Sequence, residues 1–136
     1  MVSMKWATYN YKIIPDKKLI IEAFNGNVTL DFFQESMLKE FSDPEYLFLK
    51  CGVCDLRKAN LVLSDQEIKE LFNFALEHDQ NLSIKWAALT EGPYETAMAM
   101  IYELQAAKHY GYKIFTTIET ASKYLDVPLS EELLRF

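Results

Sequence analysis

Residues 53–67, which read VCDLRKANLVLSDQE, decide the fold of this chain of 136 amino acids. The stretch begins within a compact apolar run, residues 49–56, which is typical of a buried strand. A loop is expected over residues 57–63. Ser64 and Glu67 then form a Ser-x-x-Glu capping box, in which each side chain accepts a hydrogen bond from the backbone N–H of the other residue. The stretch therefore predicts a buried strand followed by a capped helix.

The helix that begins at this capping box has the clearest amphipathic pattern in the chain. Its apolar residues recur at the spacing i, i+3, i+4, i+7 and i+8, which places them on one side of an α-helix. They are Ile68, Leu71, Phe72, Ala75 and Leu76. We expect this side of the helix to lie in the core.

Two β-rich runs, residues 9–14 and 19–24, precede this unit, and residues 15–18 between them read Pro-Asp-Lys-Lys. Proline presets φ for a turn, and aspartate can bond the backbone next to it. The pattern predicts an opening β-hairpin. Residues 25–27, Asn-Gly-Asn, are expected to break the second strand.

A helix is predicted after the hairpin, with Thr29 as its N-cap. Four apolar residues at helical spacing are expected to share one side of it: Leu30, Phe33, Met37 and Phe41. Pro44 disfavours helical geometry at the residue before it, so the helix should end near residues 42–44.

The second half of the chain continues the alternation of strand and helix. A strand over residues 83–90 leads to a helix that is capped by Gly92 and begins at Pro93. Gly111 is expected to end this helix. Its apolar stripe is expected at Ala97, Met98, Ile101 and Leu104.

The chain ends with a strand over residues 112–116, a helix that runs from its cap Thr117 to about Leu125, and a short helix that begins at Ser130. The elements predict one α/β domain over residues 1–136, with an N-terminal β-hairpin followed by a superhelix of strands and helices. Strands joined by helices in this order form a largely parallel sheet through right-handed crossovers. We therefore expect a mixed, mostly parallel five-stranded sheet with four to five helices mainly on one face.

The side chains of these strands alternate in character, so the two faces of the sheet should differ. One set is apolar or aromatic and consists of Tyr11, Ile13, Leu19, Ile21, Val53, Ile84, Trp86, Tyr112 and Ile114. The other set mixes charged and apolar residues, namely Lys12, Glu22, Phe24, Leu56, Lys85, Leu89, Lys113 and Phe115. We expect the helices mainly on the face of the first set. The second face should be exposed to solvent or used as a partner surface, for example in a homodimer.

The composition is that of a globular protein with a surplus of acidic residues. Half of the residues are hydrophobic, and 20 acidic residues against 14 basic ones give a net charge of −6. No basic patch offsets this charge, so binding to nucleic acid is not expected. The N-terminus lacks the apolar core of a secretory signal, and no stretch approaches the ~20 apolar residues of a membrane span. A cytoplasmic location is therefore expected.

The residue types that most often carry chemistry do not form a recognisable catalytic, redox or metal-binding set. Cys51 and Cys54 are three positions apart on a predicted strand, so they should point to opposite faces and pack in the core. His78 and His109 each lie near the C-terminal end of a predicted helix, where a cationic imidazole is favourable. We therefore expect no metal, no cofactor and no enzymatic activity.

Polar residues at the strand ends are the candidates for a binding pocket, because ligands of open α/β sheets bind beyond the carboxyl ends of the strands. These candidates are Asp55, Arg57, Ser64, Thr90, Glu91, Gly92, Tyr94, Thr116 and Thr117. The alternative is that they cap helices and close loops. Asp55 and Arg57 can likewise either pair with each other or face a ligand.

Three stretches of the chain resemble the SpoIIAA-like, or STAS-like, domains of bacteria: residues 11–30, 53–59 and 114–125. Their signatures are a hairpin closed before a Gly-Asn-Val-Thr helix entry, an Asp-Leu-Arg strand end and a Thr-Thr-Ile-Glu helix start. The resemblance covers nearly the whole chain. It implies the superhelix of strands and helices found in that family, a fold that is also similar to the lipid-binding Sec14, or CRAL-TRIO, core.

The same resemblance implies a function. Anti-sigma-factor antagonists of the STAS class bind a kinase-like protein partner with the loop and helix after the central strand, and a serine at the start of that helix is phosphorylated. By position, Ser64 would be that serine. We therefore expect a non-enzymatic regulatory or protein-interaction domain, and more specifically a phosphoswitch partner of an anti-sigma kinase.

Two other functions remain open. The similarity to the Sec14 core and an aromatic content of 14% are compatible with a carrier or sensor of a small apolar or lipid-like ligand. The polar residues at the strand ends are compatible with an enzyme, in which Asp55 and Arg57 would take part. The sequence favours the regulatory domain over both.

Overall fold

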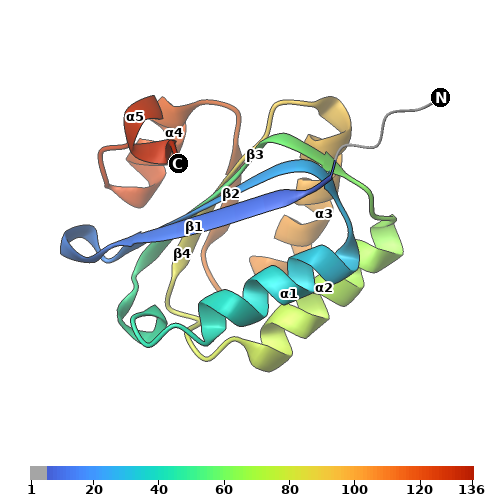
Figure 1. Cartoon of the computed structure of the whole chain (residues 1–136), viewed down its shortest axis with the longest axis horizontal. Coiled ribbons are helices and arrows are strands. Elements are labelled where there is room, and N and C mark those ends of the chain that lie inside the picture. The colour runs from blue at the N-terminus through green and yellow to red at the C-terminus, as the bar shows by residue number, and fades with distance from the viewer. Residues whose placement is uncertain (1–5) are drawn as a thin grey trace.

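The computed structural model describes residues 6–136 and contains strands and helices in the predicted order (Figure 1). The strands are β1 (Thr8–Ile14), β2 (Leu19–Val28), β3 (Cys51–Leu61), β4 (Lys85–Leu89) and β5 (Tyr112–Phe115). The α-helices are α1 (Leu30–Phe41), α2 (Asp65–His78), α3 (Pro93–Ala106), α4 (Ile118–Leu125) and α5 (Glu131–Leu134). The prediction about a secretory signal falls largely on residues 1–5, which lie outside the described residues. Within residues 6–136, no helix has the length and apolar character of a membrane-spanning segment.

The five strands form one sheet in the order β1-β2-β3-β4-β5. The hairpin strands β1 and β2 are antiparallel, and every other neighbouring pair is parallel. Each new strand is therefore added to the same edge of the growing sheet, with a helical connection between parallel neighbours. The predicted hairpin and the mixed, mostly parallel sheet are confirmed.

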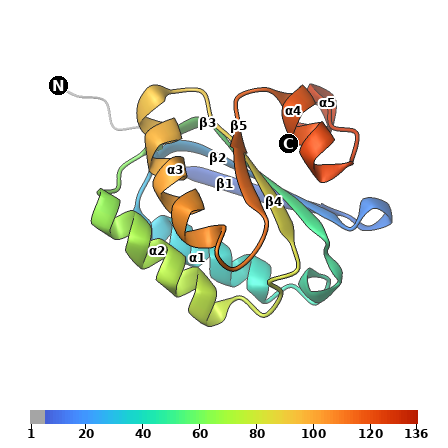
Figure 2. The same cartoon turned by 180° about the vertical axis from the view of Figure 1, so that it is seen from behind.

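The helices lie in two layers, one on each face of the sheet (Figure 2). The three longer helices, α1, α2 and α3, pack on the face that carries Phe24 and Leu56. The shorter helices α4 and α5 cover the opposite face, where Leu125 and Leu134 pack on Val53. Most of the helical residues therefore lie on one face, as the sequence predicts.

The predicted division of strand residues between the two faces is partly wrong, because it did not include the register between strands. Tyr11 lies opposite Glu22, and Ile21 lies opposite Val53. Residues directly opposite each other point to the same side of a sheet. Glu22 therefore shares the α1–α3 face with Tyr11, whereas Ile21 and Val53 lie beneath α4 and α5. Ile21 and Val53 are fully buried, so the face beneath α4 and α5 is covered by helices as well.

β2 and β3 are both longer than predicted, and they pair over their additional residues. A register shift after Ala23 lets residues 25–27 continue β2, and they pair with residues 58–60 of β3. The predicted break in the second strand and most of the predicted loop are therefore wrong. Gly26 makes the continuation feasible, because it has a φ of 79° and a Cβ there would lie 2.4 Å from the carbonyl oxygen of Trp6.

The N-caps inferred from the sequence are confirmed. Thr29, Ser64, Thr117 and Ser130 each accept a hydrogen bond from the backbone N–H three residues further along. At Ser64 the bond is reciprocal, since the Glu67 side chain also accepts from the Ser64 backbone. α3 begins at Pro93 after its Gly92 cap, again as predicted. These local signals set the starts of the helices independently of tertiary contacts.

The predicted apolar stripe of α3 is confirmed in part, because Met98 and Ile101 pack against the core cluster while Ala97 and Leu104 are exposed. The buried residues of the helix are Ala99, Tyr102 and Ala106, whereas Leu104 is 67% exposed. Met100 is also exposed, so the helix is apolar on nearly all sides. Periodicity alone therefore does not distinguish the side of this helix that faces the core.

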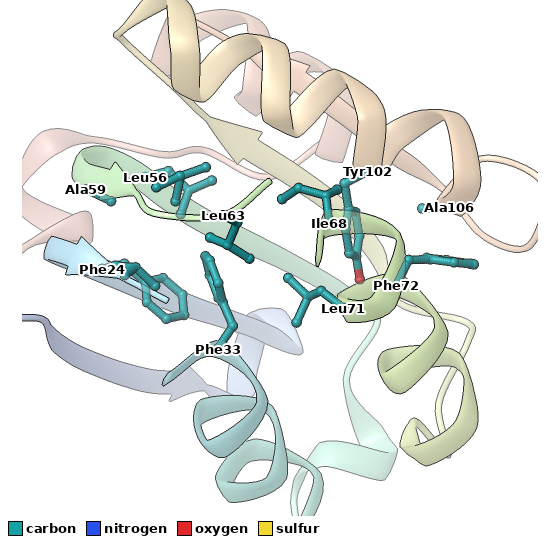
Figure 3. Packing of buried hydrophobic residues seen from close by; sticks show 12 residues of the cluster. Phe24, Phe33, Leu56, Ala59, Leu63, Ile68, Leu71, Phe72, Tyr102 and Ala106 are labelled. Carbon is teal, nitrogen blue, oxygen red and sulfur yellow. The ribbon is translucent and has the colours of Figure 1, made fainter. Parts of the chain in front are cut away.

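The largest apolar cluster lies between the sheet and the helices α1–α3 (Figure 3). Phe24 and Leu56 of the sheet meet Phe33 of α1 in this cluster. Tyr102 of α3 and Phe72 of α2 pack edge to face, with ring centroids 5.6 Å apart. The predicted core side of α2 is confirmed by its buried residues Ile68, Leu71, Phe72 and Ala75.

Replacing Phe72 by alanine should lower the free energy of unfolding by about 3–5 kcal/mol, because the ring is almost fully buried and the substitution leaves a cavity. Chemical denaturation of both proteins measures the change. Phe48→Ala is the matched control, since the Phe48 side chain is 74% exposed and its removal should change stability little. Equal losses in the two variants would contradict the assigned core.

Candidate functional site

A surface cavity of about 620 Å³ lies beside α5, on the face of the sheet that α4 and α5 cover. Of the predicted pocket residues, Asp55, Arg57 and Glu91 line it. Because β3 continues to Leu61, Asp55 and Arg57 lie within this strand, whereas the sequence analysis placed them at its carboxyl end. The other lining residues are Asn10, Ala23, Asn25, Lys58, Glu131, Leu134, Arg135 and Phe136. The C-terminal segment therefore contributes a wall that the sequence analysis did not include.

Arg57 is held between two carboxylates at this cavity. Its Nε and Nη2 donate to the two carboxylate oxygens of Asp55, each at 2.9 Å. Its Nη1 donates to Glu131 Oε1 of α5 at 2.6 Å. The hydrogen bonds with Asp55 and Glu131 raise the pKa of Arg57, and the hydrogen bond with Arg57 lowers the pKa of Glu131. Of the two alternatives for Asp55 and Arg57, the structure shows the mutual pair, which also fastens α5 to β3.

The other predicted pocket residues do not line this cavity. They are Ser64, Thr90, Gly92, Tyr94, Thr116 and Thr117. Thr90 is fully buried, and its Oγ1 is 2.8 Å from Thr96 Oγ1. Gly92 and Thr117 are helix caps, and Thr116 is an exposed residue before the second cap. The capping alternative therefore accounts for Gly92 and Thr117.

Ser64 and Tyr94 come together at a second place. Ser64 is exposed at the start of α2, and its hydroxyl accepts from the Glu67 backbone N–H at 3.1 Å. The Tyr94 hydroxyl donates to the carbonyl oxygen of Leu63 at 2.6 Å, next to Ser64. Val62 is exposed beside them. We call Val62, Ser64 and Tyr94 the Ser64 surface.

Two carboxyl groups that the sequence analysis did not single out are buried against each other beneath α1. Glu22 lies on β2 and Glu40 on α1, and they are only 9% and 1% exposed. The Tyr9 hydroxyl donates to Glu40, and the Cys54 thiol donates to Glu22. Burial raises the pKa of both carboxyl groups, and the charge of Glu22 raises the pKa of Glu40 further. Both carboxyl groups therefore hold their protons more strongly than exposed glutamates do.

A third acidic residue, Asp79, lies after α2 near this pair. Its Oδ2 accepts from the Tyr46 hydroxyl at 3.0 Å, and its Oδ1 accepts from the Asn81 backbone N–H at 2.8 Å. The Asn81 side chain in turn donates to the carbonyl oxygens of Tyr46 and Leu49. Burial raises the pKa of Asp79. These bonds connect the loop after α2 to the 3-10 turn before β3.

The three acidic residues border one cavity of about 90 Å³ between the sheet and α1–α3, which we call the core cavity. Its walls are mainly aromatic and aliphatic. The aromatic lining residues are Phe24, Phe33, Phe41, Tyr46, Trp86, Tyr102, Tyr110 and Tyr112. The polar side chains at the core cavity are thus set within an apolar enclosure.

The sequence contains a signal for the buried acidic pair. Glu22 interrupts the otherwise apolar run of residues 19–24, and on a strand at the centre of a sheet such a residue is expected to be buried. Glu40 follows Phe33 by seven residues and Ser36 by four, so it lies on the core side of its helix. Only the register of β1 and β2, however, shows that Glu22 faces α1.

The cysteine and histidine expectations agree with the positions of these residues. Cys51 packs in the cluster beneath α4 and α5, whereas Cys54 packs with the cluster beneath α1–α3, so the two thiols point to opposite faces. His78 ends α2, and its Nδ1 lies 2.9 Å from the carbonyl oxygen of Phe74. His109 lies after α3, with its ring 5.5 Å from that of Phe72. Within residues 6–136, no group of three acidic, cysteine or histidine side chains is arranged to hold a metal ion.

Replacing Glu40 by glutamine should stabilise the protein increasingly as the pH rises from about 4. Because the pKa of Glu40 is raised in the folded state, its contribution to stability is complete at acidic pH. This contribution is lost as the pH rises through the folded pKa. The amide of a glutamine can also donate a hydrogen bond to Glu22, and it does not ionise as the pH rises. Unfolding free energies of wild type and variant from pH 4 to pH 9 measure the difference.

Glu35→Gln is the control for this measurement, because Glu35 is an exposed residue of the same helix. Its difference from wild type should not rise with pH in the same way. A Glu40→Gln difference that stays flat over the whole range would show that Glu40 has an ordinary carboxyl pKa.

A scan against protein-family models and a search of curated proteins find no match to this chain. Solved structures do match. An anti-sigma factor antagonist from Mycobacterium paratuberculosis aligns with a TM-score of 0.61 and 11% identity, over 89% of this chain and 95% of that one. An uncharacterized protein of the DUF3478 family with a SpoIIAA-like fold, from Shewanella loihica, aligns with a TM-score of 0.54 and 16% identity, over 92% of this chain and 99% of that one. The chain therefore has the SpoIIAA-like, or STAS-like, fold that its hairpin and strand-end signatures imply.

Proposed function

We propose that this chain is a non-enzymatic regulatory domain of the cytoplasm that binds a protein partner through the Ser64 surface. We further propose that phosphorylation of Ser64 by a kinase of the anti-sigma class controls this binding. The observation that carries the proposal is the exposed position of Ser64 at the start of α2, in a fold shared with an anti-sigma factor antagonist. The partner would therefore contact the end of β3 and the first turn of α2.

The Ser64 surface has the composition of a protein contact. Val62 is 53% exposed and Tyr94 is 48% exposed, on either side of the polar serine. Aromatic residues, tyrosine among them, are enriched in protein interfaces, where their rings supply contact area. The hydrogen bond from the Tyr94 hydroxyl to Leu63 holds this ring in place before a partner arrives. A pre-positioned contact of this kind supports binding without a large ordering cost.

Phosphorylation of Ser64 would change the first turn of α2. A phosphate carries about −1.5 to −2 charges at neutral pH. The carboxylates of Asp65 and Glu67 already occupy this helix N-terminus, and Glu67 accepts from the Ser64 backbone N–H. A phosphate would repel the Glu67 carboxylate and compete for the same backbone donors. The capping box would then open at the surface that a partner contacts.

The hydrogen bonds of Asp55, Arg57 and Thr90 support a structural role for these three candidate residues. The Nε, Nη1 and Nη2 atoms of the Arg57 guanidinium all donate hydrogen bonds to the carboxylates of Asp55 and Glu131. Thr90 is buried and bonded to Thr96. These pairings favour the regulatory domain over an enzyme that uses the same residues.

A second function, that of a small-ligand carrier or sensor, is favoured by the core cavity. The cavity holds about 90 Å³ and is mostly apolar. An engineered cavity of about 150 Å³ accepts benzene. The core cavity is therefore suited to a small molecule of a few atoms and not to a lipid chain.

Ser64→Ala should lower the free energy of unfolding by about 1 kcal/mol, because it removes the side-chain cap of α2. Thr117→Ala, which removes the cap of α4 on the other face, should have a similar cost. Thermal or chemical unfolding measures both. A Ser64→Ala protein as stable as wild type would show that the capping box contributes nothing.

Ser64→Glu should weaken partner binding by at least about tenfold, whereas Ser64→Ala should bind nearly as wild type does. The experiment uses the anti-sigma kinases of the same organism, with phosphate incorporation and calorimetric affinity as measurements. Thr117→Ala is the control, because it removes a comparable cap away from the Ser64 surface. Partners that bind all four proteins equally, together with a serine that no kinase modifies, would end the phosphoswitch proposal.

A further inference from the structure

The core cavity has an unusual combination of charge and wall chemistry. Three of the 20 residues that line it are acidic, and eight are aromatic. Lysine, arginine and histidine do not occur among these described lining residues. The three carboxyl groups at the cavity therefore face no basic side chain among these residues.

The acidic pair at the core cavity is organised by hydrogen bonds from four elements. Tyr9 of β1 donates to Glu40 of α1, which meets Glu22 of β2, and Cys54 of β3 donates to Glu22. When the pair ionises, its negative charge lies in a mainly apolar enclosure that contains no basic side chain among the described lining residues. A buried charge is costly unless an opposite charge or further donors accompany it. The pair is thus a site where a cation would be favourable.

The aromatic walls suit the same kind of ligand. The rings of Tyr102 and Tyr112 are 5.0 Å apart, and the hydroxyls of Tyr102 and Tyr110 are 3.3 Å apart. The face of an aromatic ring carries partial negative charge and attracts ammonium groups, and cages of such rings recognise organic cations. The same rings also pack against alkyl groups. A molecule with a cationic end and a short apolar end would meet favourable contacts at both.

The size and position of the core cavity limit the ligand further. A volume of about 90 Å³ is smaller than the ~150 Å³ that accommodates benzene, so it fits about four non-hydrogen atoms. Asp79, Trp86 and Tyr110 line the cavity and are only half-buried. Side chains of the cavity wall therefore reach the protein surface.

We propose that the core cavity binds a small organic cation, namely a short alkylammonium ion. The ammonium group lies against the Glu22–Glu40 carboxyl pair, and the alkyl group packs among the tyrosine rings. Such a ligand places a positive charge against the carboxyl pair and fills the cavity. This binding does not depend on Ser64, since the proposed phosphorylation site lies at the exposed start of α2.

The test is a titration of the full chain with propylammonium chloride and, separately, with 1-propanol, a neutral molecule of nearly the same shape. Calorimetry measures affinity, and the NMR signals of the Trp86 indole and of the Cys54 and Tyr112 amides report the location. At an ionic strength of about 0.15 M, the attraction of the ammonium ion to surface charges more than about 8 Å away is largely screened. We expect saturable binding of propylammonium at least about tenfold tighter than that of 1-propanol, with shifts at these three residues.

The double variant Glu22→Gln and Glu40→Gln should lose this preference, so that both probes bind equally weakly. Glu35→Gln should keep it, because Glu35 is exposed on the outer side of α1. Equal binding of the two probes by wild type, or no saturable binding, would overturn the proposal without any variant. A preference that persists in the double variant would overturn it as well, because the cation would then bind elsewhere.

Discussion

The parallel pairing of β2 with β3 is the interaction on which the rest of the structure depends. β4 and β5 are added beyond β3, so the register of this pair sets the faces of the whole sheet. Ile21 opposite Val53 places both beneath α4 and α5, and Glu22 opposite Cys54 places both beneath α1. The pairing continues past a register shift to the end of both strands, and Ser64 follows directly. The pairing of β2 with β3 therefore positions the core, the buried acidic pair and the exposed start of α2.

The two proposed sites share one helix, although they have opposite environments. α2 begins at Ser64 on the exposed edge of the sheet, and its buried residues Ile68, Leu71 and Ala75 line the core cavity. The Ser64 surface is suited to a protein partner because it is exposed and partly apolar. The core cavity is suited to a small cation because it is enclosed, acidic and aromatic.

Local signals account for the parts of the fold and site that were predictable. A cap acts within one helical turn, so Ser64 with Glu67, and likewise Thr29 and Thr117, could be recognised from their neighbours in the sequence. The alternation of strands and helices implied the mostly parallel sheet in the same way. For the pocket, the candidates Asp55, Arg57 and Glu91 line one cavity, because β4 ends opposite Asp55 and Glu91 follows that end. The other candidates are caps or lie elsewhere, since proximity in sequence does not specify which side chains meet.

The sequence by itself determined the order of the elements, the starts of the helices and the exposed serine at the head of α2, because these depend on contacts within a few residues. Only the tertiary structure decided which side of α3 is buried, how far β2 and β3 extend, and which face carries Glu22. It also decided that Glu22 and Glu40, 18 positions apart, are buried together beside an aromatic cavity. The physical reason is that register and packing join distant residues, and a single apolar run or a lone glutamate carries no information about its partner.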